Sequence, residues 1–177
     1  MTSPAAPRPL IDRIPAGTWQ VVPHASTARF TVRDKTVATV HGTLPVTAGT
    51  AALAPTGVLT HARVELDATA IDTGNSRRET HLATPGLLDT ATHPTVVVTA
   101  GPSTPGPDGW ELAATLSARG TRAPVGLRAV IAGEHAEGIR VHVHGRLDRT
   151  PLAMKIPRFI IGRYLDLDVD LLFVPRT

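Results

Sequence analysis

The sequence has no cysteine and few aromatic residues. Without cysteine, the 177-residue chain can form neither disulfide bonds nor thiolate metal sites. Three Phe, two Trp and one Tyr leave little surface on which bases could stack. The net charge is only +3, and no long block of like charges is present. We therefore expect no nucleic-acid partner.

Long apolar runs are also missing. No segment approaches the roughly 18 apolar residues of a membrane-spanning helix, so we expect no membrane span. The proline-rich start lacks the apolar stretch of a signal peptide. We expect residues 1–13 to be an extended or poorly ordered lead-in and residues 14–177 to form one domain. The expected location is the cytoplasm.

From Gly17 onward, apolar and polar residues alternate as they do in strands. Residues 110–118, for example, place Trp110, Leu112 and Leu116 on one face and Glu111 on the other. Turn signals such as residues 47–50 (TAGT) and 132–138 (AGEHAEG) separate the segments. The pattern predicts strands near 17–22, 26–33, 37–46, 58–71, 94–101, 110–118, 124–133, 137–149 and 162–174.

Antiparallel strands with one apolar face need that face covered, which predicts an all-β sandwich or barrel. The long strands near 58–71, 137–149 and 162–174 favour a tall barrel of about eight strands. Such a barrel has room for packed side chains or for one small ligand. The apolar face consists mainly of Ala, Val and Leu, and the pattern leaves both a filled and an open lumen as alternatives.

One stretch differs from the strands around it: residues 73–94 (TGNSRRETHLATPGLLDTATHP), which we call the plug. Ser76 and Glu79 have the spacing of a capping box and predict a helix to about Ala83. Thr84 and Pro85 then predict a second short helical turn. We expect this short helical insert, after the fourth expected strand, to turn its leucines toward the barrel.

His142 and His144 are the only metal-like pattern that we single out. Two residues apart on a strand, both imidazoles lie on one face, about 6.5–7 Å apart. Asp166, Asp168 and Asp170 would face them if the last strand pairs with theirs, giving a divalent-metal set. The alternative is ordinary charge pairing on the outer face, which we favour over a metal site.

The assembled motifs resemble the YceI family of lipocalin-like proteins from about Ile14 to Val174. The segments that carry the resemblance are residues 26–30 (STARF), 40–44 (VHGTL), 70–82 (AIDTGNSRRETHL) and 116–125 (LSARGTRAPV). The resemblance implies an elongated antiparallel barrel of about eight strands that holds a long isoprenoid chain. Polyprenyl phosphates and isoprenoid quinones are the ligand class associated with the family, which brings no catalytic residues.

The chain departs from the family pattern mainly in its loops. Residues 133–138 (GEHAEG) stand where relatives carry a long Trp/Gly-rich loop, and the segment 154–159 (MKIPRF) is also short. Loops at a barrel mouth govern ligand access. The isoprenoid specificity of the family therefore depends on the segments in which this chain departs from the family pattern.

The leading hypothesis is a protein that binds a long apolar molecule in its lumen, for transport, storage or sequestration. No cofactor is expected apart from a bound isoprenoid or other lipid. The alternatives are an enzyme that uses a pocket His or Asp as acid or base on a lipophilic substrate, and a ligand-free barrel that serves a partner protein. A homodimer is left open.

Two groups of residues are expected at the ligand. The apolar lining is expected from Phe30, Val32, Leu66, Ala68, Leu82, Leu87, Leu88, Val96, Val98, Leu112, Leu116, Val141, Val143 and Leu167. Polar contacts at the mouth are expected from Arg78 and His81 first, and then from Arg149, Lys155 and Arg158.

Overall fold

The structure is a computed structural model that describes residues 9–34, 38–156 and 161–177. Within them, the strands are β1 (Gly17–Val21), β2 (Thr27–Asp34), β3 (Thr39–Leu44), β4 (Val46–Leu53), β5 (Leu59–Asp67), β6 (Thr95–Ala100), β7 (Gly109–Ala118), β8 (Thr121–His135), β9 (Gly138–Asp148) and β10 (Ile161–Pro175). The helices are α1 (Ser76–Leu82) and the 3-10 turns η1 (Leu10–Arg13), η2 (Pro23–Ala25), η3 (Ala68–Ala70) and η4 (Thr150–Leu152).

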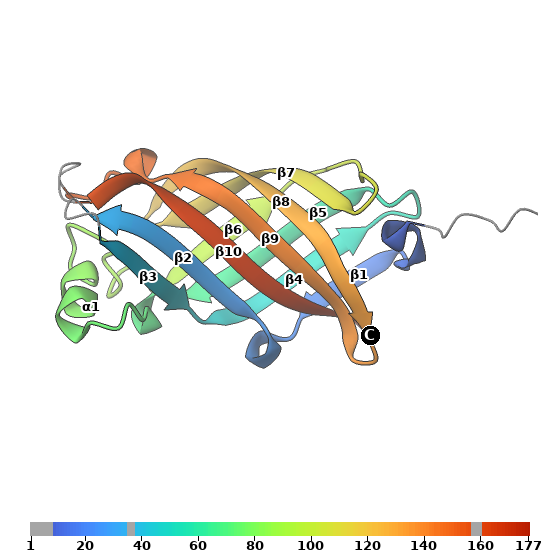
Figure 1. Cartoon of the computed structure of the whole chain (residues 1–177), viewed down its shortest axis with the longest axis horizontal. Coiled ribbons are helices and arrows are strands. Elements are labelled where there is room, and N and C mark those ends of the chain that lie inside the picture. Colours follow the sequence, from blue (N-terminus) through green and yellow to red (C-terminus); the bar gives the residue numbers. More distant parts are fainter. Residues whose placement is uncertain (1–8, 35–37, 157–160) are drawn as a thin grey trace, which may run out of the picture.

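The strands form a closed antiparallel barrel. Strands β4 to β10 pair consecutively, and β1 pairs with both β4 and β10, which closes the ring. β2 continues β1 along β10, and β3 precedes β4 in the same way, so the ten strands occupy eight positions. The elongated barrel is seen from the side in Figure 1. The expected all-β, lipocalin-like barrel of about eight strands with a short helical insert is confirmed.

The break between β1 and β2 has a local cause. Pro23 has no N–H to give to a ladder, and the chain makes the 3-10 turn η2 there. The Ser26 hydroxyl repairs the pairing with β10: its Oγ accepts from the Leu172 N–H at 3.1 Å and donates to the Val22 carbonyl at 2.8 Å. The long strand therefore bends without losing its place in the barrel.

The turn expected at residues 47–50 is wrong, because this segment lies inside β4. β4 pairs with β1 on one side and with β5 on the other, and these ladders override the weak strand preference of Ala and Gly. The chain turns instead at residues 54–57, where Gly57 has a φ of 83° and the N–H of Gly57 donates to the Ala54 carbonyl. The sequence thus missed β4, and the helical insert expected after the fourth strand follows the fifth, β5.

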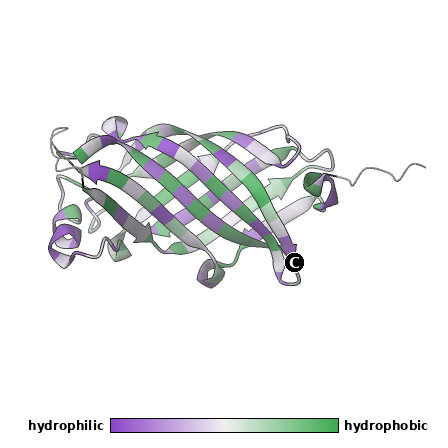
Figure 2. Cartoon of the chain, in the orientation of Figure 1, coloured by the Kyte–Doolittle hydropathy of each residue, from purple (hydrophilic) through white to green (hydrophobic). Residues whose placement is uncertain are grey.

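The alternation of the strands separates the inside of the barrel from the outside. On β7, Trp110, Ala114 and Leu116 are buried, whereas Glu111 and Ala113 are exposed. Figure 2 shows the same alternation as bands of hydrophobic and hydrophilic residues along the strands. One large apolar cluster includes buried residues from nine of the ten strands.

The two ends of the barrel are covered differently. η1 and the start of β1 lie at one end, and α1 lies at the other (Figure 1). Residues 10–13, expected to be part of an extended lead-in, form a 3-10 turn instead, because Ile11 is buried in a second apolar cluster with Leu59 and Trp110. We call this the tryptophan end, and the opposite one the plug end.

Candidate functional site

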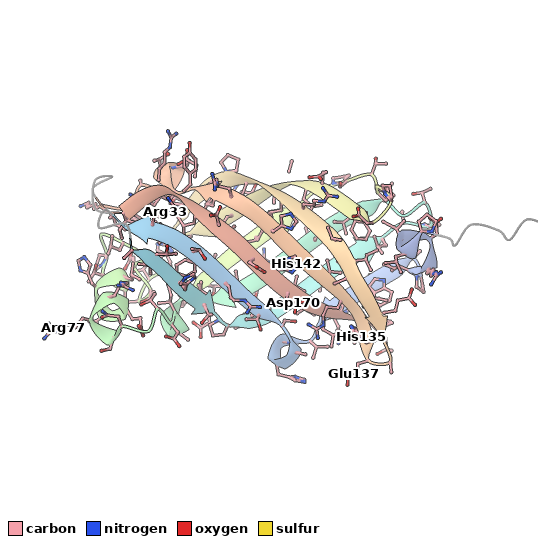
Figure 3. All side chains as sticks on the ribbon, in the orientation of Figure 1. Arg33, Arg77, His135, Glu137, His142 and Asp170 are labelled. Atoms are coloured by element: carbon pink, nitrogen blue, oxygen red, sulfur yellow. The ribbon has the colours of Figure 1, made fainter. Side chains whose placement is uncertain are left out.

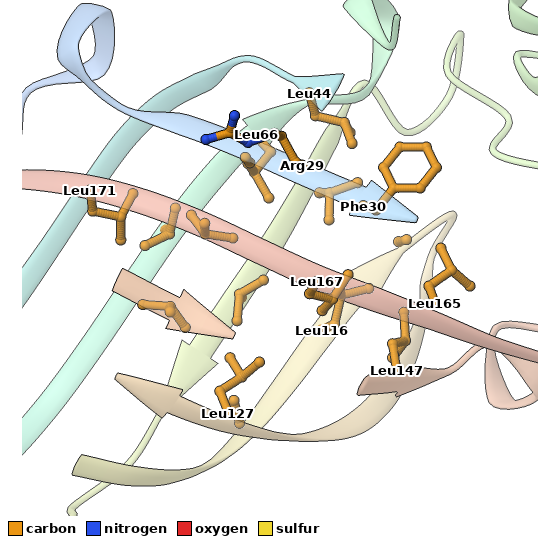
Figure 4. A pocket seen from close by; sticks show the side chains of 18 of the residues that line it. Arg29, Phe30, Leu44, Leu66, Leu116, Leu127, Leu147, Leu165, Leu167 and Leu171 are labelled. Atoms are coloured by element: carbon orange, nitrogen blue, oxygen red, sulfur yellow. The ribbon is translucent and has the colours of Figure 1, made fainter. Parts of the chain in front are cut away.

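A cavity of about 430 Å³ runs inside the barrel. Trp19 and Trp110 line it at the tryptophan end, and Thr73 and Leu82 line it at the plug end. Figure 4 shows leucines from several strands converging on this space together with Phe30. The sequence left a filled and an open lumen as alternatives, and the structure has the open one.

Most residues of the expected apolar lining lie on the wall of this cavity. They are Phe30, Val32, Leu66, Leu82, Leu88, Val96, Val98, Leu112, Leu116, Val141, Val143 and Leu167. Strand alternation placed them there, except for the two leucines of the plug. The wall also includes Ile71, Thr73 and Met154, which lie outside strands and for which no periodic signal exists.

Two expected lining residues are not on the wall. Ala68 is buried, but β5 ends at Asp67 and the chain turns into η3, where the Ala68 N–H donates to the Pro94 carbonyl. Leu87 is also buried, within the turn that follows α1, and its neighbour Leu88 faces the cavity instead. Both predictions extended a regular element beyond its real end.

The helix of the plug begins one residue earlier than the capping box predicted. Its N-cap is Asn75, whose Oδ1 accepts from the Arg78 N–H at 3.0 Å, so Ser76 is the first helical residue. Glu79 does reach back, but its Oε2 accepts from the Asn75 N–H at 3.0 Å. A second turn does begin at Thr84, whose carbonyl accepts from the Leu87 N–H at 3.0 Å. It is not helical, and the Thr84 hydroxyl donates to the His81 carbonyl instead of capping it.

The expected polar residues fall in different places. Arg78 and Arg149 line the cavity at the plug end. His81 is exposed and is not part of the wall. Lys155 is also exposed, with its side chain against Gly86. Arg158 lies outside the described residues.

Arg149 is the buried charge of this site, with only 4% of its surface exposed. It precedes η4, and its guanidinium donates from Nε to the Gly162 carbonyl and from Nη2 to the Ile161 carbonyl, both at 2.8 Å. These bonds fix the plane of the group against β10. The adjacent Asp148 is turned to Arg163 and Thr150, whose hydrogen bonds hold the pKa of Asp148 well below its usual range.

Arg119 fastens the plug to the barrel, a role that the sequence did not reveal. It lies in the β7–β8 turn with a positive φ of 45°. Its Nη2 donates to the Pro85 carbonyl at 3.0 Å, and its Nη1 donates to the carbonyls of Leu152 and Ala153 at 3.0 and 2.7 Å. One side chain thus joins the plug, η4 and the β7–β8 turn.

The outer face carries the charge pairing that we favoured over a metal site, with ion pairs between arginines of β9 and aspartates of β10. In the ladder of β9 and β10, His144 faces Asp168 and His142 faces Asp170. His142 Nε2 lies 3.5 Å from Asp168, and the two imidazole centres are 5.8 Å apart. Figure 3 shows His142 and Asp170 on the outside of the barrel. No group of three or more His, Asp or Glu suited to a metal ion occurs among the described residues.

A family model described as a YceI-like domain matches residues 19–173, nearly the whole barrel. The chain belongs to the YceI family. The family resemblance seen in the sequence is therefore confirmed. No curated protein matches the chain.

Several solved structures have the same fold at low sequence identity. BcnA from Burkholderia cenocepacia superposes with a TM-score of 0.72 at 15% identity, covering 85% of this chain and 98% of that one. A polyisoprenoid binding domain from Saccharophagus degradans gives 0.68 at 16%, covering 89% and 98%. The YceI protein of Campylobacter jejuni gives 0.61 at 16%, covering 77% and 81%.

The part of the chain that the structure describes contains no helix long and apolar enough to cross a membrane.

Proposed function

We propose that this YceI-family chain is a binding protein that holds a long apolar molecule of isoprenoid type in its lumen, for transport, storage or sequestration. The observation that carries the proposal is the continuous cavity of about 430 Å³, lined almost throughout by apolar side chains. The size and apolar lining are those of a small-molecule site. The similar domain from Saccharophagus degradans, named for polyisoprenoid binding, supports the ligand class.

An empty apolar cavity of this size would be costly. At about 24 cal/mol per Å³, the value from core truncations, a volume of about 430 Å³ corresponds to about 10 kcal/mol. That is comparable with the whole net stability of a domain, about 5–15 kcal/mol. An apolar occupant that restores the missing contacts would recover much of it, which favours a lumen that is filled by a ligand.

The described wall offers little to the enzymatic alternative. That alternative requires a pocket His or Asp as acid or base, and neither residue type is among the described residues of the wall. The exposed His81 and the outer-face His142 lie away from the cavity. The cytoplasmic location stays a prediction.

Two adjacent alanines of β7 provide a test with a matched control. Ala114 lines the cavity, whereas Ala113 is exposed on the outer face. We expect the wild-type protein and A113W to bind a long isoprenoid alcohol such as geranylgeraniol, and A114W to lose binding because its indole occupies the lumen. Circular dichroism checks that both variants fold.

Native mass spectrometry of gently purified protein complements the titration. A lipid-sized adduct on the wild type and A113W, absent from A114W, would support the carrier. Failure of the wild type to bind any long-chain isoprenoid would overturn the proposal and favour a ligand-free barrel that serves a partner protein.

A further inference from the structure

The two ends of the barrel expose side chains of opposite charge. The exposed cations of the plug end (residues 33, 67–94, 118–122, 148–156 and 161–164) are Arg33, Arg77, Arg122, Lys155 and Arg163. The exposed carboxylate among the same residues is Asp72, and Asp34 ends β2 beside them. The less exposed groups there nearly balance one another: they are the carboxylates Asp67, Glu79, Asp89 and Asp148 and the cations Arg78, Arg119 and Arg149. Positive side chains therefore predominate on the surface of this end.

The tryptophan end has the opposite balance. Its exposed carboxylates are Asp12, Asp108, Glu111, Glu134 and Glu137, and its exposed cations are Arg13, Arg128 and Arg176. Figure 3 shows Arg33 and Arg77 at one end of the barrel and His135 and Glu137 at the other. The molecule therefore has an electric polarity along its long axis, with the plug at the positive end.

Four of the exposed plug-end cations have no carboxylate partner. Arg163 pairs with Asp148 at 2.8 Å, whereas the other four form no ion pair with any residue that the structure describes. Unpaired exposed cations keep their attraction for an external anion, because no neighbouring carboxylate offsets their charge. The five cations come from β2, α1, β8, the segment after η4 and β10. A broad anionic surface can reach such a spread of charges together.

Tyr164 adds an exposed aromatic ring to the same end. The side chain is 48% exposed, and it is one of two large hydrophobic side chains that are exposed among the described residues. It lies on β10 opposite Asp148, the last residue of β9. The Cζ atoms of Arg163 and Arg146 are 5.3 and 5.9 Å from the centre of its ring. An amphipathic ring among cations is typical of side chains that lie at the level of lipid head groups.

We propose that the plug end of the barrel docks on a lipid surface that contains anionic lipids. The exposed cations contact the head groups, Tyr164 enters the head-group layer, and the more acidic tryptophan end points away from the surface. Each cation near such a surface strengthens binding about 5-fold, which gives reversible docking rather than permanent anchoring. The inference goes beyond the proposed function, because it concerns the outer surface and not the lumen.

Vesicle co-sedimentation without any added lumen ligand measures the docking. We would compare vesicles of phosphatidylcholine that contain about one third phosphatidylglycerol with vesicles of phosphatidylcholine alone. We expect binding to the anionic vesicles and none to the neutral ones. Added salt should weaken the binding, because at 0.1 M it already screens exposed charges beyond about 10 Å.

Two pairs of exposed arginines provide matched variants. R33Q/R77Q removes two cations from the plug end, and R13Q/R176Q removes two from the tryptophan end, so the net charge changes equally. None of the four side chains forms an ion pair with a described residue, so both variants should fold. We expect R33Q/R77Q to bind the anionic vesicles about 30-fold more weakly and R13Q/R176Q to bind them as the wild type does.

The orientation can be measured with single cysteines, because the chain has none of its own. His81 on the plug and His135 at the tryptophan end are both exposed. After labelling with an environment-sensitive fluorophore, H81C should show blue-shifted emission on the anionic vesicles, and H135C should not.

Four outcomes would overturn the docking inference. They are no binding to the anionic vesicles, equal binding to the neutral ones, equal weakening by the two double variants, and a blue shift at H135C but not at H81C. Binding of heparin without binding of the anionic vesicles would assign the cations to a soluble polyanion and overturn it as well. A114W fills the lumen and leaves the outer surface unchanged, so it should bind the vesicles as the wild type does. Failure of docking therefore leaves the carrier function standing, and failure of lumen binding leaves the docking standing.

Discussion

Phe30 and Gly42 lie directly opposite each other in the ladder of β2 and β3, near the plug end of the lumen. A Cβ at position 42 would lie 2.2 Å from Cζ and 2.4 Å from Cε1 of Phe30, so the ring rests against the strand only because Gly42 has no side chain. Packing an aromatic ring over a cross-strand glycine is a known way to compensate for the missing side chain. Without a side chain at position 42, the ring can lie against β3 on the wall of the lumen.

The substitution G42A should turn the Phe30 ring into the lumen. Gly42 does not have a positive φ, so the alanine is compatible with the backbone. The stability cost should be about 1 kcal/mol, the low end for overpacking, because the ring has open space to enter. If the ring displaces three or four ligand methylene groups at about 0.8 kcal/mol each, affinity should fall about 50- to 200-fold.

Tryptophan fluorescence titration with a long-chain isoprenoid measures this loss, and urea unfolding measures the stability. G126A is the control, because a Cβ at Gly126 would meet nothing within 4 Å. The double variant F30A/G42A should recover binding, because no ring remains to be displaced. The reasoning is refuted if folded G42A binds as tightly as the wild type, or if the double variant binds no better than G42A.

Three further predictions concern the plug and its surroundings. R119M removes hydrogen bonds to three backbone carbonyls, so it should lower the free energy of unfolding in urea by about 2–3 kcal/mol and speed up hydrogen exchange in the plug. R122M, on the exposed face of β8, should change neither quantity. Equal effects of the two substitutions would contradict the fastening role. N75A should destabilise the protein by about 1 kcal/mol through the lost N-cap, and S76A by much less, so the reverse order in thermal melts would restore the predicted capping box. Because the pKa of Asp148 is lowered in the folded state, its ionised carboxylate stabilises the fold at pH values above the ordinary Asp pKa, and this stabilisation is lost as the pH falls below about 4. The free energy of unfolding of D148N should therefore vary less with pH in acid titrations than that of the wild type. An unchanged profile would contradict this.

The barrel could be predicted from sequence because alternation with a period of two leaves few choices of face. Once Trp110, Leu112 and Leu116 point inward, the rest of β7 follows. β4 could not be predicted in this way, since its Ala and Gly residues are of types that are depleted in strands. Its conformation is set by the ladders on both sides, which pair residues far apart in the chain.

The plug end was harder to predict, because its chemistry depends on helical phase and on contacts between loops. Arg78 and His81 were equal candidates in the sequence. The position of the helix start, which differs by one residue from the expected one, does not determine which of the two side chains reaches the cavity. Tertiary packing selects Arg78 for the wall and leaves His81 exposed. The fastening by Arg119 joins three irregular segments, and no local pattern encodes such contacts.

The scarcity of aromatic residues, which is evident in the sequence, is the physical cause of the open lumen. An eight-stranded barrel is just wide enough for its inward side chains to fill it. Here alanines occupy many wall positions, including Ala28, Ala62, Ala100, Ala114 and Ala129. Both tryptophans lie at one end, where they cover the tunnel rather than block its length. The small wall residues thus leave volume that a packed core would fill, and under the proposed function an apolar ligand restores the missing contacts.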